Sequence, residues 1–149
     1  MLLGGEQDLW RRMSGPDRRH AIGVARDTTR LFSPDKPPRE VLAAALLHDV
    51  GKVESGLGTF PRVGVTLAAM AVGRRRLLRW SGSVQATAER SWRNRVGLYL
   101  SHDRLGADLL AAAGSEDLTV AWAREHHLPS EQWSVDARVG AALKAADGD

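Results

Sequence analysis

Seven consecutive apolar residues, Val41 to Leu47, lead directly into a histidine and an aspartate, His48 and Asp49. A helix built from such a run has no polar side, so we expect it to be central in the fold and buried all round. A carboxylate that directly follows this run is costly to bury unless it is paired or bound to a cation. The run therefore predicts a helical core with a polar site at one end of its central helix. A structural salt bridge and a bound metal are both open as the partner of Asp49.

The remaining segments carry the apolar periodicity of helices rather than the alternation of strands. We therefore expect an all-α fold, a compact single-domain helical bundle over residues 1–149 with about six or seven helices. The main helices are expected at about 17–32, 39–50, 60–80, 84–95, 96–113, 118–127 and 135–146, after a short turn or helix at 8–12.

The chain contains five histidines and no cysteine. The lack of cysteine excludes disulfides, cysteine-ligated zinc, iron–sulfur clusters and thiol catalysis. Any transition-metal site must therefore combine histidine with aspartate or glutamate. The candidates lie on five separate expected helices and number seven: His20, His48, Asp49, His102, His126, His127 and Asp147. A single histidine in a helix is more often a surface or core residue than a metal ligand. The occurrence of all seven candidates together, in this order along the chain, is what favours a metal site.

Basic residues are concentrated in the middle third of the chain. The net charge is +3, but residues 51–100 hold nine basic and two acidic residues, which leaves +7 in that section. Arg74, Arg75, Arg76 and Arg79 either form a solvated face, or a rim that attracts phosphate, or a surface for nucleic acid or anionic membrane. We expect Asp103, beside His102, to face solvent.

The order of these residues resembles the HD-domain superfamily of metal-dependent phosphohydrolases, from about residue 17 to 147. The block His48-Asp49-Val50-Gly51-Lys52 matches the core motif of that family. The segment from His102 to Ala107 resembles the His-x-x-x-Gly-Ala segment of members with two metals, and Lys144-Ala145-Ala146-Asp147 resembles their last helix. The ligand order is similar to the branch that hydrolyses dinucleoside tetraphosphates symmetrically. The domain core would span 17–52 and 96–147, with a basic helical insertion at about 60–95.

The resemblance implies one or two divalent transition-metal ions, iron or manganese first, with magnesium, cobalt, nickel or zinc as alternatives. Carried over by position, one metal would bind His20, His48, Asp49 and Asp147. The second would bind His102 and one of His126 and His127, with His126 preferred and Asp49 bridging the two ions.

The activity implied is hydrolysis of a small phosphate ester or anhydride, first of all a nucleotide, by a hydroxide that bridges the metals. Asp49 and Lys52 are then the catalytic candidates, and Lys52 would neutralise a phosphate oxygen. Lys52, Arg74, Arg75 and Arg76 are the candidates for binding substrate. One alternative is a diiron oxygenase on the same fold. Another is a non-enzymatic helical module that binds nucleic acid, an anionic membrane or a protein through its arginine-rich segment.

The N-terminus has neither the basic start nor the apolar run of a signal peptide. The longest apolar stretch, at 63–73, is shorter than the roughly 20 residues of a membrane span. On these grounds we expect a cytoplasmic protein.

Overall fold

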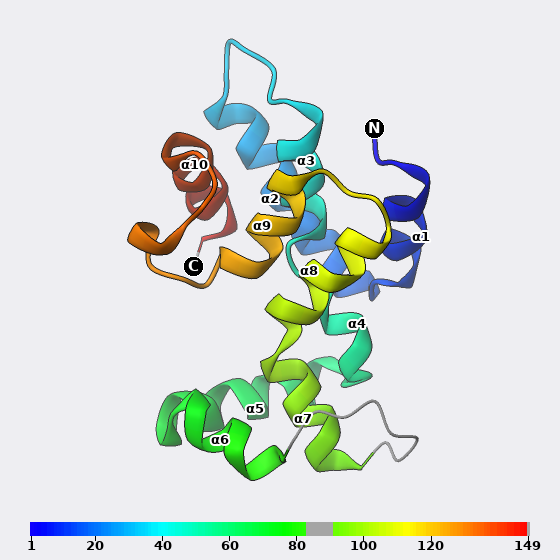
Figure 1. Ribbon diagram of the computed structural model, residues 1–149, viewed down its shortest axis with the longest axis vertical. Helices are drawn as coiled ribbons and strands as arrows, with labels where there is room; N and C mark the ends of the chain where they lie inside the picture. The colour runs from blue at the N-terminus through cyan, green and yellow to red at the C-terminus, as the bar shows by residue number, and fades with distance from the viewer. Residues whose placement is uncertain (83–90, 149) are drawn as a thin grey trace.

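The computed structural model describes residues 1–82 and 91–148 (Figure 1). These residues form ten α-helices and one 3-10 helix, and no strand occurs among them, which confirms the all-α class with more helices than the six or seven expected. The elements are α1 (Gly4–Arg12), α2 (Gly15–Leu31), α3 (Arg39–Leu47), α4 (Lys52–Ser55), α5 (Thr59–Val72), α6 (Arg74–Ser81), α7 (Trp92–Leu100), α8 (His102–Ala112), α9 (Asp117–Glu125), η1 (Ser130–Gln132) and α10 (Ala137–Asp147).

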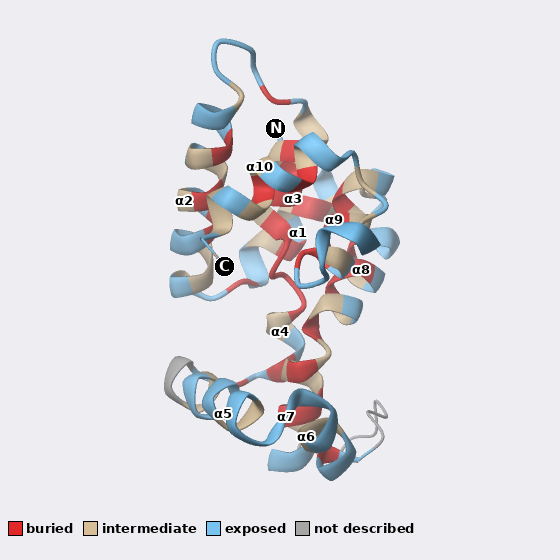
Figure 2. Cartoon of the chain, turned by 90° about the vertical axis from the view of Figure 1, so that its left-hand side faces the viewer, coloured by how far each residue is buried: buried red, intermediate tan, exposed pale blue. Residues whose placement is uncertain are grey.

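Helix α3 lies at the centre of the larger end of the molecule, as its composition predicts. Val41, Ala44 and Leu47 are fully buried. The helix contacts α2 and α9 most extensively and also meets α1 and α10 (Figures 1 and 2). Two hydrophobic clusters lie on either side of α3 and contain Leu46 and Leu47 in one and Val41, Ala44 and Ala45 in the other, whereas the polar residues His48 and Asp49 enter the interior at the end of the helix.

Helices α5, α6 and α7 form a smaller group at the opposite end of the molecule from α3 and α10 (Figure 2). Leu57, Val65, Val96 and Leu100 make a separate small core there. The short helix α4 and the junction from α7 to α8 join this group to the larger end (Figure 1). Among the described residues, no helix is both long enough and apolar enough to cross a bilayer.

Three of the expected helices are broken where the chain must turn. The helix expected at 39–50 ends at Leu47, and the next four residues turn into α4. The helix expected at 60–80 is split at Gly73, whose φ of 89° is open to glycine but strained for other residues. The helix expected at 96–113 is split at Ser101, so His102 opens a new helix. Most of the expected helix at 84–95 lies outside the described residues, and α7 begins at Trp92.

Candidate metal centre

Five helices bring the seven candidate ligands to one place. His48 and Asp49 directly follow α3, and His102 is the first residue of α8. His126 and His127 directly follow α9. The remaining two candidates, His20 and Asp147, lie within α2 and at the last position of α10. Helix ends thus supply most of the set, which lets short side chains from different helices converge.

The ligand atoms form two groups, each with all of its atoms within 4.8 Å of one another. One group contains Asp49, His102, His126 and His127, and the other contains His20, His48 and Asp147. The groups adjoin, because His48 Nε2 lies 3.6 Å from Asp49 Oδ2 and 3.4 Å from Asp147 Oδ1. All seven candidates are therefore part of one continuous cluster.

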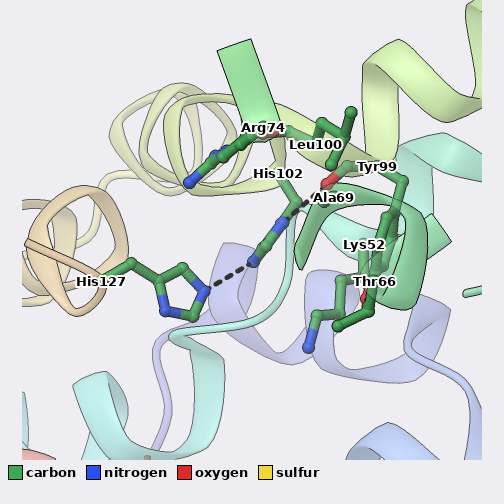
Figure 3. A pocket seen from close by; sticks show the side chains of 8 residues that line it. All are labelled: Lys52, Thr66, Ala69, Arg74, Tyr99, Leu100, His102 and His127. Carbon is green, nitrogen blue, oxygen red and sulfur yellow. Dashed lines mark hydrogen bonds between the residues drawn. The ribbon is translucent and has the colours of Figure 1, made fainter. Parts of the chain in front are cut away.

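Distances within the cluster suit ligands of a shared ion. Asp49 Oδ1 lies 3.4 Å from His102 Nε2 and 3.9 Å from His126 Nε2. The Nε2 atoms of His102 and His127 are 3.3 Å apart (Figure 3). Ligand atoms about 2.0–2.2 Å from one metal lie roughly 3–4 Å from one another. This spacing suits a shared divalent ion, although His20 Nε2 and Asp147 Oδ1 lie 2.8 Å apart and are close enough for a hydrogen bond without one.

Three of the histidines are oriented by the backbone carbonyl of the residue three positions earlier in the chain. The Nδ1 atoms of His48 and His102 lie 3.0 Å from Ala45 O and 2.7 Å from Tyr99 O. His126 Nδ1 lies 3.1 Å from Ala123 O. A carbonyl can only accept a hydrogen bond, so each Nδ1 carries the proton and donates it. Each Nε2 is thereby left as the atom that faces Asp49, in the arrangement typical of metal-ligating histidines.

Asp49 carries the central negative charge of the cluster. Burial alone would raise the pKa of its carboxyl, but hydrogen bonding to His102 and the proximity of His48 and Lys52 hold that pKa well below its usual range. Lys52, one helical turn further on, donates a hydrogen bond to Asp49 Oδ2. Burial alone would lower the pKa of Lys52, and the Asp49 carboxylate more than offsets this, so the pKa of Lys52 is raised. Both groups are charged at neutral pH.

The paired histidines are held neutral. Burial, followed by the charge of His127, lowers the pKa of His126 to about 3. Burial and the neighbouring His102 lower the pKa of His127 to about 4. A neutral imidazole is the form that binds a metal, so neither residue has to lose a proton at neutral pH before it can act as a ligand.

Two buried atoms in this cluster have no hydrogen-bond partner within the part of the chain that the structure describes. They are Asp49 Oδ1 and His126 Nε2, which face each other. An orphaned acceptor in a protein interior costs about 1–3 kcal/mol, so such atoms require an explanation. A divalent cation between them satisfies both lone pairs, and we conclude that the residues present fit a metal.

A cavity of about 290 Å³ opens beside the cluster, and Figure 3 shows the side chains around it. Its walls include Lys52, Thr66, Arg74, Tyr99, His102 and His127. Sequence reasoning missed Tyr99 and Thr66. Tyr99 lies three residues before His102, stacks on its imidazole with ring centroids 5.7 Å apart, and supplies the carbonyl that orients it. The spacing of three residues between Tyr99 and His102 was the sequence signal that could have identified Tyr99 as a neighbour of the site.

The arginine run divides in the structure. Arg74 lines the cavity, and its Nη2 donates to Asp103 Oδ2 at 2.8 Å. The expectation that Asp103 faces solvent is therefore wrong, because its carboxylate is mostly covered and paired. Arg75 and Arg76 are exposed on α6 and do not line this cavity. Of the four predicted substrate-binding residues, the structure brings only Lys52 and Arg74 to the cluster.

Comparison with protein families relates the chain to a known family. A family model described as "HD domain" matches residues 18–147, which is most of the chain and includes every candidate ligand. Among curated proteins and solved structures, none matches the chain.

Proposed function

The chain belongs to the HD domain family, and from this premise we propose that it is a metal-dependent phosphohydrolase. The family is largely one of metal-dependent hydrolases. The observation that carries the proposal is the pair of orphaned buried atoms, Asp49 Oδ1 and His126 Nε2, inside a cluster of five histidines and two aspartates. Such a cluster has little structural use without a cation, since it concentrates desolvated polar groups.

The two groups of ligands support two ions. His20, His48 and Asp147 would hold one, and His102 with His126 or His127 would hold the other. Asp49 lies between the groups and would bridge the ions. Divalent metals at such a site lower the pKa of bound water and offset negative charge on phosphate oxygens. Iron or manganese suits these nitrogen and oxygen ligands, and the other divalent metals named above are alternatives.

The reaction proposed is hydrolysis of a small phosphate ester or anhydride. Water adds its oxygen to phosphorus, the bond from phosphorus to the leaving oxygen breaks, and the leaving oxygen takes up a proton. Lys52 lies at the boundary of the cluster and the cavity, where its ammonium can bind a phosphate oxygen and stabilise the charge that develops there. Tyr99 orients His102 from the cavity side. Nucleotides are the first substrates to test.

The proposal is tested by metal analysis of the purified protein and by phosphate release. Nucleoside phosphates, dinucleoside polyphosphates and simple phosphate esters should be screened with Mn²⁺ and with Fe²⁺. We expect bound metal and turnover of at least one class. Asp49→Asn removes the bridging charge at constant size, and we expect it to lose metal and turnover together. Full metal content and an unchanged rate in this variant would contradict the proposal.

Oxygen consumption is the matched control for the iron-loaded protein. A hydrolase consumes no oxygen while it releases phosphate. If oxygen uptake depends on substrate and no phosphate is released, the same residues support an oxidation and the hydrolase proposal is wrong.

A further inference from the structure

A second hollow of about 230 Å³ adjoins the cavity beside the metal cluster. Lys52, Thr66 and Tyr99 line both spaces, so these three side chains form the boundary between them and Lys52 faces both. The far side of the second hollow is formed by Pro16, Val63 and Leu67. A molecule whose phosphate lies at Lys52 can therefore extend its remaining part along α5.

The charged groups of the second hollow bind one another. Arg62 Nη1 lies 2.8 and 2.7 Å from the two carboxylate oxygens of Asp17, and Arg62 Nη2 donates to Lys52 O at 3.2 Å. Both side chains of this ion pair are largely covered. The two charges offset each other, so the pair presents little net charge to a ligand, although the buried Arg62 Nε has no hydrogen-bond partner among the described residues.

The hydroxyl groups of the hollow are also engaged. Thr66 donates to Arg62 O at 3.0 Å, and Thr66 Oγ1 lies 3.2 Å from the hydroxyl oxygen of Tyr99. The surface left to face a ligand is the ring of Tyr99 together with Pro16, Val63 and Leu67. These side chains recognise a ligand by contact area rather than by hydrogen bonds.

The apolar surface is exposed directly beside the polar cluster. Val63 is 53% and Leu67 is 60% exposed on the outer face of α5. Contiguous apolar surface next to a polar site is typical of ligand-binding grooves, where a few polar groups fix orientation and apolar walls supply affinity. Here the polar groups are Lys52 and the metal cluster, and the apolar wall is α5 with Tyr99.

We propose that the substrate is a phosphate ester with an uncharged, predominantly apolar organic group, which lies in the second hollow against Tyr99, Val63 and Leu67. The proposal rests on the phosphohydrolase function and adds its substrate class. Alkyl and aryl groups share this chemistry. Because the polar side chains of the hollow are already hydrogen-bonded, the identity of a nucleobase should matter little compared with apolar area.

The first test is a series of alkyl phosphates from methyl to hexyl, assayed by phosphate release with the Mn²⁺-loaded protein. Each methylene buried in the hollow should raise kcat/KM about two- to fourfold over the first few members. Phenyl phosphate and the four nucleoside monophosphates distinguish aryl groups and bases from alkyl groups. Ribose 5-phosphate is the polar control, and we expect it to react no faster than methyl phosphate.

A matched pair of variants locates the effect. Leu67→Gln makes the wall of the hollow polar at constant length, and we expect it to flatten the dependence on chain length, mainly through KM. Met70→Gln is the control, because Met70 is 78% exposed on the same helix and lines neither space. We expect it to behave as the wild type. An equal effect of both variants would overturn the proposal.

A binding measurement separates this proposal from the hydrolase function. Alkylphosphonates cannot be hydrolysed, and calorimetry should show their affinity increasing with chain length in the wild type but not in Leu67→Gln. Turnover without any dependence on chain length would overturn the substrate class and leave the hydrolase intact. Chain-length-dependent binding with no turnover of any ester would overturn the hydrolase and support the apolar hollow. If the protein shows neither turnover of any ester nor binding that depends on chain length, both the hydrolase function and the apolar substrate class are overturned.

Discussion

The backbone of Gly51 packs directly on the backbone of His102. A methyl group added to Gly51 would overlap the His102 carbonyl oxygen and lie 2.6 Å from the amide nitrogen of Gly106. The glycine after the His-Asp pair thus lets the end of α3 approach the start of α8, which brings His102 to Asp49. Neither atom in this contact belongs to a flexible side chain, so the neighbours cannot move aside easily.

We therefore expect Gly51→Ala to lower the free energy of unfolding by about 3 kcal/mol or more, since overpacking against backbone forces shifts in two helices. Urea unfolding measures the loss. Gly23→Ala is the control, because its added methyl group meets nothing within 4 Å inside α2. That variant should be neutral or more stable by up to about 1 kcal/mol. Equal stability of the two variants would show that the close approach is unimportant.

Divalent metal should stabilise the folded protein. Binding to the native state alone adds about 2.7 kcal/mol at a free metal concentration 100 times Kd. We expect Tm to rise with Mn²⁺ and to return to its starting value with a chelator. The response should require Asp49 and be almost absent in Asp49→Asn. A metal-dependent rise of equal size in that variant would place the ion elsewhere.

The two adjacent histidines should differ in their effect on stability. His126 is fully buried, so His126→Ala leaves a cavity and should cost about 2–4 kcal/mol as well as weakening metal binding. The side chain of His127 is covered only in part, with its Nε2 atom facing His102, so His127→Ala should weaken metal binding with a much smaller loss of stability than His126→Ala. Denaturant unfolding without metal and metal titration of both variants check this contrast.

The metal-free protein should lose stability on acidification through His126. Its pKa is about 3 in the folded protein and about 6.5 when unfolded, so the unfolded chain binds more protons below pH 6.5. This group alone removes about 2 kcal/mol between pH 7 and pH 5. The raised pKa of His48 acts in the opposite direction. His126→Gln should therefore show a smaller fall than the wild type over this range, and an identical fall would exclude this origin.

Replacing Arg74 should lower the stability of the fold, whereas replacing the adjacent Arg75 should not. Arg74 joins the start of α6 to the junction of α7 and α8, since its Nε donates to Leu100 O at 3.1 Å and its Nη2 to Asp103. Arg74→Ala should cost about 1 kcal/mol of stability and also raise KM, because the side chain lines the cavity. Arg75→Ala, at an exposed position on the same helix, should change neither quantity.

The central helix and the candidate ligands could be predicted from local signals. Val41 to Leu47 can only be buried, and the His-Asp pair after them needs a partner. The division of the arginine run could not be predicted, because Arg74 and Arg75 differ only in which distant carbonyl or carboxylate each reaches. The break at Gly73 has a local signal in the glycine itself, whereas neither the pairing of Asp103 nor the break at Ser101 has one. Both of the latter depend on contacts between α6, α7 and α8, and helical propensity does not report such contacts.

The backbone carbonyls that face His48, His102 and His126 make the rotation of three candidate ligands a property of the main chain. Each carbonyl belongs to the residue three positions earlier in the chain, so it reaches the site together with its histidine. A main-chain carbonyl is present whatever the side chain. Substitutions at Ala45, Tyr99 and Ala123 should therefore keep these three contacts as long as the local backbone is unchanged.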